Sequence, residues 1–206
     1  NEPTGIAFDA AGRVWVADSL NDRVQVFDGN GAHLLTVGGR GRFKRPAHVS
    51  ADARGRVWVA DKGNHRVLAL DENGQTLLTL GGDDASPNAL SQPSGVVADE
   101  PAGRVFVADT GHDRLIVYDE SGTVLHAAGA KGDGPGELSQ PGGLALNASR
   151  TRLYIADTLN NRGQQWALTS GPVPDRTMPR AELIEPRDGA VLTNVQTVTL
   201  TGRAVD

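Results

Sequence analysis

Two ionisable side chains recur at a fixed spacing and are the first candidates for chemistry. An Ala-Asp pair occurs four times, at intervals of 43, 48 and 48 residues, and an Arg follows each Asp by five. A ring of carboxylate–guanidinium pairs could hold a ligand. We favour a structural interpretation, because every copy carries the pair and an Asp after a strand accepts backbone N–H bonds across a turn. The pairs are Asp18 and Arg23, Asp61 and Arg66, Asp109 and Arg114, and Asp157 and Arg162.

A basic loop connects the first repeat to the second. Four cations surround one aromatic ring in this stretch: Arg40, Arg42, Phe43, Lys44 and Arg45. Such a loop could dock a phosphate, an acidic glycan or an acidic strip of a protein. The alternative is a solvated loop whose charges only aid solubility. The sequence makes this loop the candidate contact with a partner.

His48 is the other candidate, because it replaces a glycine that the other repeats keep at Gly5, Gly95 and Gly143. The chain has no Cys, which excludes thiol catalysis and disulfides. No Ser/His/Asp order, phosphate-cradling glycine loop or metal-spaced carboxylate cluster stands out. We therefore predict no catalytic residues, no metal site and no cofactor.

Charge and hydropathy narrow the partner classes. The net charge is −5 and the pI is about 5.5, which weighs against a nucleic-acid binder, whose footprint is basic. No run of about 18 apolar residues occurs, so we expect no membrane insertion in this segment. A protein or a glycan remains as the expected partner.

The elements that must position these residues repeat about every 45 positions. Each repeat opens with Pro and a short apolar strand a, followed by an Asp-to-Gly turn, an aromatic-containing strand b, a polar turn, strand c, a second Asp-x-x-Gly turn and strand d. We interpret Asn21, Asn64, Asn160 and His112 as turn residues that tolerate the left-handed region. A fixed period of four-stranded antiparallel meanders predicts an all-β propeller. The strand a openings are 3–9, 46–52, 93–99 and 141–147.

The repeated phrase resembles the NHL repeat. Its core reads VWVADSLNDRV from Val14, VWVADKGNHRV from Val57, VFVADTGHDRL from Val105 and LYIADTLNNRG from Leu153. The match runs from Pro3 to about Leu168, over three complete copies and a partial fourth. The resemblance implies a β-propeller, commonly of six blades. In propellers the b–c turns and the d–a connections share the usual binding face, so the basic loop is expected there, with His48 near the mouth of the central channel.

The resemblance favours a non-catalytic interaction or scaffold module, although animal NHL proteins also bind RNA on this face. The first alternative is a metal-dependent enzyme of the lyase or lactonase type. An NHL-like lyase carries His ligands to zinc on its inner strands, whereas only one inner strand here offers a histidine, and zinc needs about three ligands. The second alternative is a structural spacer in a filament or surface layer.

The chain's ends depart from the repeat. We predict propeller blades over 1–170, a Pro-rich linker over 171–180, and the opening strands of a bacterial immunoglobulin-like β-sandwich over 181–206. Because both units look incomplete, we expect a segment of a longer polypeptide, with a closed four-bladed ring as the alternative. Resemblance alone then predicts an extracellular or cell-surface location in a large exported bacterial protein.

Overall fold

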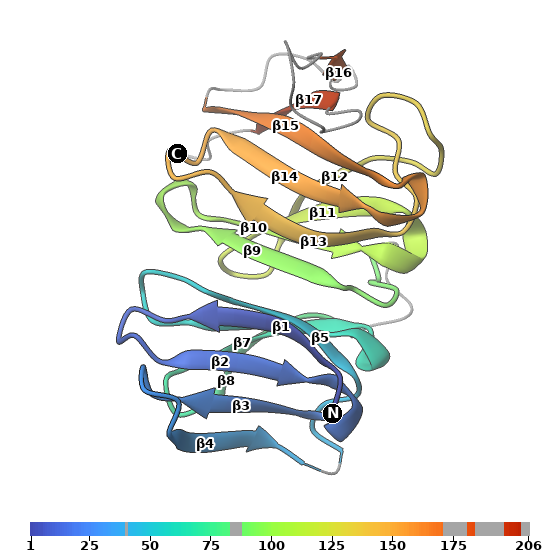
Figure 1. Cartoon of the computed structure of the whole chain (residues 1–206). Coiled ribbons are helices and arrows are strands. Elements are labelled where there is room, and N and C mark those ends of the chain that lie inside the picture. Colours follow the sequence, from blue (N-terminus) through green and yellow to red (C-terminus); the bar gives the residue numbers. More distant parts are fainter. Residues whose placement is uncertain (40, 83–87, 171–180, 184–195, 203–206) are drawn as a thin grey trace.

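The chain folds into four β-sheets that stand side by side as propeller blades (Figure 1). The computed structural model describes residues 1–39, 41–82, 88–170, 181–183 and 196–202. The first strands of the four sheets, β1, β5, β9 and β13, contact one another in that order. This arrangement confirms the predicted all-β propeller with four-stranded blades.

Blades 1 to 3 are antiparallel meanders whose strands pair in sequence order. In all four blades a single turn of 3-10 helix joins the second and third strands. Blade 1 holds β1 (Pro3–Phe8), β2 (Val14–Asp18), η1 (Ser19–Asn21), β3 (Arg23–Phe27) and β4 (His33–Gly38). Blade 2 holds β5 (Pro46–Ala51), β6 (Val57–Asp61), η2 (Lys62–Asn64), β7 (Arg66–Leu70) and β8 (Thr76–Gly81). Blade 3 holds β9 (Gly95–Asp99), η3 (Glu100–Ala102), β10 (Arg104–Asp109), η4 (Thr110–His112), β11 (Arg114–Asp119) and β12 (Val124–Ala128).

The fourth sheet differs at its outer edge. It holds β13 (Pro141–Leu146), β14 (Arg152–Asp157), η5 (Thr158–Asn160) and β15 (Arg162–Ser170). In place of an antiparallel fourth strand, β17 (Gln196–Gly202) pairs in parallel with β15, and β16 (Ala181–Leu183) pairs with β17. The predicted linker over 171–180 and most of the predicted sandwich segment lie outside the described residues. The sandwich therefore stays a prediction.

The core lies between blades rather than within one, because neighbouring sheets bury their facing side chains against each other. Strand b supplies the largest side chains: Trp15 packs toward blade 2, Trp58 toward blade 3 and Phe106 toward blade 4. The opposing strands supply Val, Leu, Ile and Ala, as a chain with only 4% aromatic residues requires. Trp166 on β15 is buried with the last of these clusters.

The Asp-to-Gly turns of the first three repeats form as predicted. Asp9 Oδ1 accepts the backbone N–H of Ala11 and of Arg13 at 3.0 and 2.9 Å, and Gly12 has φ 76°. In the fourth repeat, which lacks this glycine, Arg150 adopts the left-handed conformation with φ 54°. A non-glycine residue tolerates that region only when its surroundings hold it there.

Blade 1 exposes the sheet face that a preceding blade covers elsewhere. Ile6 is 63% exposed, whereas Val49, at the same register position in blade 2, is 1% exposed against blade 1. Phe8 is 69% exposed. This face of blade 1 carries apolar side chains of the kind that are buried at the other blade junctions, but no described blade packs against it. Within the described residues, no helix is long and apolar enough to cross a bilayer.

Candidate binding face

The repeated Asp residues are buried at the ends of the second strands. Asp61, Asp109 and Asp157 have no exposed surface, and Asp18 retains little. In every blade the Arg five residues later donates from Nε to Oδ2 of the Asp, at 2.7 to 2.9 Å. These pairs therefore form within one blade, at the turn between strands b and c.

The second carboxylate oxygen fixes the connection that enters the blade. Asp61 Oδ1 accepts the backbone N–H of Lys44 at 2.8 Å, and Ser91 and Ser139 donate in the same way to Asp109 and Asp157. The paired Arg reaches a carbonyl of the same connection, as Arg66 does to Arg42 at 2.6 Å. Intramolecular donors thus occupy both oxygens, which fits the structural interpretation better than a ligand ring.

Burial raises the pKa of Asp157, but hydrogen bonds from Asn160, Ser139, Gln164 and Arg162 more than offset it, so the pKa lies below its ordinary value. The Asp18 carboxyl has its pKa lowered in the same balance, with the amino group of Asn1, Arg23, Asn21 and Gln25 as donors. These carboxylates are charged at neutral pH and are held by fixed donors.

The left-handed residue of the b–c turn lies one position later than the sequence prediction placed it. Asp22, His65, Asp113 and Asn161 have φ of 50° to 55° and end the 3-10 helices. The residue before each, predicted to take that conformation, instead binds the buried Asp through its side chain: Asn21, Asn64, His112 and Asn160. The 3-10 helix is three residues long and ends at this Asn or His, so the left-handed cap falls on the residue that follows it.

The basic loop is fixed at several points rather than simply solvated. Arg40 lies outside the described residues. Arg42 donates to the carbonyl of Gly74 and stacks over the Phe43 ring at 5.5 Å. Phe43 is 2% exposed and packs in the core between blades 1 and 2. A side chain that is buried so completely cannot make the partner contact that the sequence predicted for Phe43.

The two remaining cations of the loop point outward. Lys44 and Arg45 are exposed, while the backbone N–H of Arg45 donates to Asp22 Oδ1 at 2.7 Å. Lys44 also packs over Gly63, whose N–H donates to the Lys44 carbonyl at 2.7 Å. Any Cβ at Gly63 would lie 2.6 Å from Lys44 Cγ, so only glycine allows this approach.

This contact brings Lys62, the residue before Gly63, beside the loop. We call Lys44, Arg45 and Lys62 the cationic patch. Within the described part of the chain, none of the three forms an ion pair. The sequence interpretation missed Lys62, although its place in the b–c turn of the same blade was a usable signal. The patch lies where the predicted binding face was expected.

His48 lies in β5, partly buried between blades 2 and 3. Its Nδ1 accepts the backbone N–H of Val96 at 3.4 Å. Burial lowers the pKa of His48 below its ordinary value. Among the residues that the structure describes, no three His, Asp or Glu side chains are placed to hold a metal ion.

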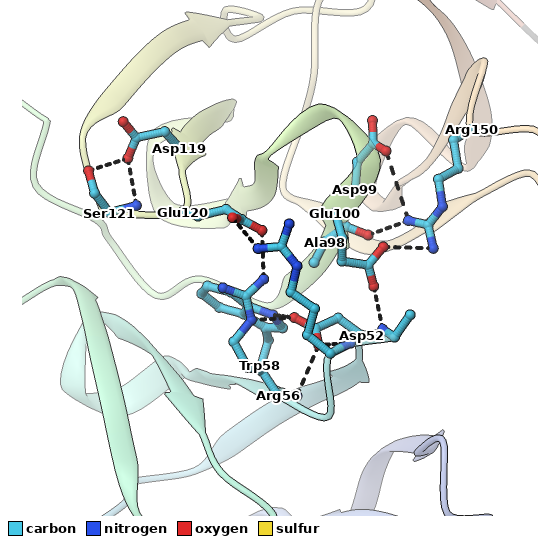
Figure 2. Close-up of polar contacts among 12 residues, drawn as sticks. Asp52, Arg56, Trp58, Ala98, Asp99, Glu100, Asp119, Glu120, Ser121 and Arg150 are labelled. Atoms are coloured by element: carbon cyan, nitrogen blue, oxygen red, sulfur yellow. Dashed lines mark hydrogen bonds and ion pairs between the residues drawn. The ribbon is translucent and has the colours of Figure 1, made fainter.

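The opposite face, formed by the a–b and c–d turns, uses its cations between blades (Figure 2). Arg56 donates to Asp52 in its own blade at 2.6 Å and to Glu120 in blade 3 at 2.8 Å, and Arg54 also pairs with Glu120. Hydrogen bonds from Arg56 and Arg54 lower the pKa of Glu120.

The network continues into blade 4. Glu100 accepts the backbone N–H of Ala53 at 2.6 Å and pairs with Arg150 at 2.9 Å (Figure 2). Arg150 also donates to the carbonyl of Ala98 at 2.8 Å. These contacts explain why Arg150 is held in a left-handed conformation. They join blades 2, 3 and 4 through residues that the sequence interpretation did not single out.

A cleft of about 280 Å³ opens on this same face between blades 1 and 2. Three arginines line it together with Asp71, Glu72 and Leu77. Arg13 is committed to Asp9 and to the Glu72 carbonyl, at 2.7 and 3.1 Å. The cations of this cleft are balanced by carboxylates, so it offers less to an anion than the cationic patch does.

Comparison with known proteins supports the repeat and the fold. The NHL repeat matches residues 1–27 and 43–70, and the family described as 6-bladed beta-propeller matches residues 88–179. A comparison with curated proteins found no match. These two matches together cover parts of all four blades.

Three solved structures share the fold at 16% to 19% identity. A streptogramin B lyase superposes with a TM-score of 0.64 at 18% identity, covering 80% of this chain and 51% of the lyase. A chain of a nidogen/laminin complex superposes with a TM-score of 0.62 at 19% identity, covering 79% of this chain and 59% of that chain. An auxiliary nutrient binding protein from Bacteroides ovatus superposes with a TM-score of 0.60 at 16% identity, covering 78% of this chain and 47% of that protein. This chain spans about half the length of these structures. It carries NHL repeats and folds as the blades of a β-propeller.

Proposed function

We propose that this segment is a non-catalytic interaction module that binds a carboxylate-rich protein or glycan at the cationic patch. The observation that carries the proposal is the set of three cations without ion pairs in the described part, mounted on a fixed backbone. The Lys44 and Arg45 amides are both held by buried or turn carboxylates. A partner would therefore meet charges on a rigid support and lose little entropy in ordering it.

The relatives in fold are compatible with binding as a role. One is a chain of a nidogen/laminin complex, and another is described as an auxiliary nutrient binding protein. As part of the same proposal, the module belongs to a large exported bacterial protein at the cell surface. The predicted opening strands of an immunoglobulin-like domain at 181–206 would be the next module of that exported protein, and this prediction depends on the sequence alone.

The proposal is tested with two carboxylated probes, a fluorescent ten-residue glutamate peptide and an oligogalacturonate. Exposed ion pairs contribute about 0.5 kcal/mol each, so the triple variant K44E/R45E/K62E is expected to bind at least about tenfold more weakly at low salt. Lys131→Glu, an exposed lysine on the connection between blades 3 and 4, serves as the control and should change binding less than about twofold.

The melting temperature of the triple variant should match that of the wild type, since none of the three side chains forms an ion pair in the described part. If the wild type binds neither probe, or if Lys131→Glu weakens binding as much as the triple variant, the patch is not the binding site.

A second proposal concerns the exposed face of blade 1. We infer that another blade covers Ile6 and Phe8 in the complete protein, closing a six-bladed ring. The matched family is described as six-bladed, and this chain spans half of its structural neighbours. Mass spectrometry of the full polypeptide should give a mass well above 21.6 kDa. A mass of 21.6 kDa in a monomer would contradict the inference.

A further inference from the structure

The three blade junctions use the same hydrogen bond but not the same acceptor. At each one, the residue before the Pro of the next blade donates its backbone N–H to the left-handed residue of the preceding b–c turn. Arg45 donates to Asp22 Oδ1 and Gln140 to Asp113 Oδ1, both at 2.7 Å. At the junction of blades 2 and 3, Gln92 donates to His65 Nδ1 at 3.3 Å.

The inner strands show the same exception. A Cβ at Gly5 would lie 2.8 Å from the Cα of His48, and a Cβ at Gly95 would lie 2.2 Å from the Gly142 carbonyl, so these strands approach through glycine. Between blades 2 and 3 the corresponding residue is His48, and its Nδ1 accepts the Val96 N–H at 3.4 Å. One junction therefore relies on two imidazole acceptors.

An imidazole nitrogen accepts a hydrogen bond only while it is unprotonated, because both nitrogens of the imidazolium ring are donors. Protonation of His48 and His65 would turn two acceptors into donors that face backbone N–H groups. Asp22 and Asp113 offer carboxylate oxygens in the same place, and carboxyl groups ordinarily titrate near pH 4, well below the histidine range. Acid in the histidine range thus acts on one junction and spares the other two.

Few charges surround these rings. Around His48, β1 brings no titratable group, and the neighbouring strands bring Asp residues already bound by arginines: Asp18 by Arg23, Asp61 by Arg66 and Asp99 by Arg104. Around His65, the charged residues of its own turn and the flanking strands are Asp61, Lys62 and Arg66, and Asp61 is already bound by Arg66. β8 and residues 88–92 bring none. Within the described residues, no free carboxylate is placed to stabilise an imidazolium at the junction.

We propose that the junction between blades 2 and 3 is a pH-sensitive joint, which loosens when protonation removes its imidazole acceptors while the junctions on either side stay closed. Burial lowers the pKa of His48, so the open junction binds more protons than the closed one. The closed form is fully favoured above the ordinary histidine range, near pH 6.5, and loses stability as the pH falls below it.

Amide hydrogen exchange measures this directly on the intact chain. Each histidine that gains a proton on opening makes opening up to about tenfold easier per pH unit. Corrected for intrinsic exchange, protection of the Gln92 and Val96 amides should fall at least about fivefold between pH 7.5 and 5.5. The Arg45 and Gln140 amides, bound to Asp22 and Asp113, are the internal controls and should change less than about twofold.

Variants that copy the other junctions identify the cause. His65→Asp installs the residue type of Asp22 and Asp113, and His48→Gln keeps an acceptor that does not titrate. The double variant H48Q/H65D should fold and lose the pH dependence at Gln92 and Val96. An equal fall of protection at all three junctions, or an unchanged fall in the double variant, would overturn the proposal.

Discussion

Two groups of cations on opposite faces of the blades differ in their partners. On the face of the a–b and c–d turns, Arg56 and Arg150 are bound by carboxylates from neighbouring strands or blades (Figure 2). On the face of the b–c turns, Lys44, Arg45 and Lys62 have no such partner in the described part. The difference separates charges that hold blades together from charges that are available to a second molecule, although both look alike in a sequence.

The largest effect should come from a buried carboxylate that ties a connection to its blade. Asp61→Ala leaves the Arg66 guanidinium and the Lys44 N–H without their acceptor, and we expect a loss of about 2–3 kcal/mol in the free energy of unfolding, measured in urea. Asp71→Ala removes a half-buried turn carboxylate that forms no ion pair in the described part and is the matched control, with a loss of about 1 kcal/mol or less. Equal losses would mean that the buried Asp has no special role.

The next prediction concerns the face of the a–b and c–d turns. Glu120→Ala removes the acid that joins Arg54 and Arg56 of blade 2 to blade 3, and we expect a loss of about 1 kcal/mol in the free energy of unfolding. Glu72→Ala is the control, since Glu72 occupies the same turn position in blade 2 without an ion pair in the described part, and it should cost less than about 0.5 kcal/mol. A larger loss of unfolding free energy for Glu72→Ala than for Glu120→Ala would contradict the stabilising role of the Glu120 ion pairs.

A pH series sharpens the same point. The pKa of Glu120 is lowered in the folded protein, so its contribution is present above the unfolded value of about 4.3 and is lost as the pH falls through the folded value. The difference in unfolding free energy between the wild type and Glu120→Gln should therefore shrink from pH 7 to pH 3. A difference that stays constant over this range would rule out the charged pair as its source.

The repeat made much of this fold predictable. Period, turn residues and the Asp–Arg spacing determined the blades and strand order, because each depends on contacts close in sequence. The burial of Phe43 was missed because its loop looked polar. An apolar residue stands three positions before each following Pro, at Phe43, Leu90 and Leu138, and this was the available signal.

Long-range contacts were beyond the sequence. The bonds of Glu100 and Glu120 join positions about fifty or more residues apart, and no local pattern indicates such partners. The bulge in each outer strand, which leaves Leu34, Leu77 and Leu125 exposed, also depends on pairing across the sheet. The role of His65 appeared only when its acceptor position could be compared with Asp22 and Asp113.

The most direct test of the account is the affinity of the glutamate peptide for three proteins at low and physiological salt: the wild type, K44E/R45E/K62E and Arg54→Gln. We predict at least about tenfold weaker binding for the triple variant, less than about twofold for Arg54→Gln, and a difference that narrows as salt rises. Equal binding by all three proteins, or a larger loss for Arg54→Gln, would contradict the division between structural and available cations.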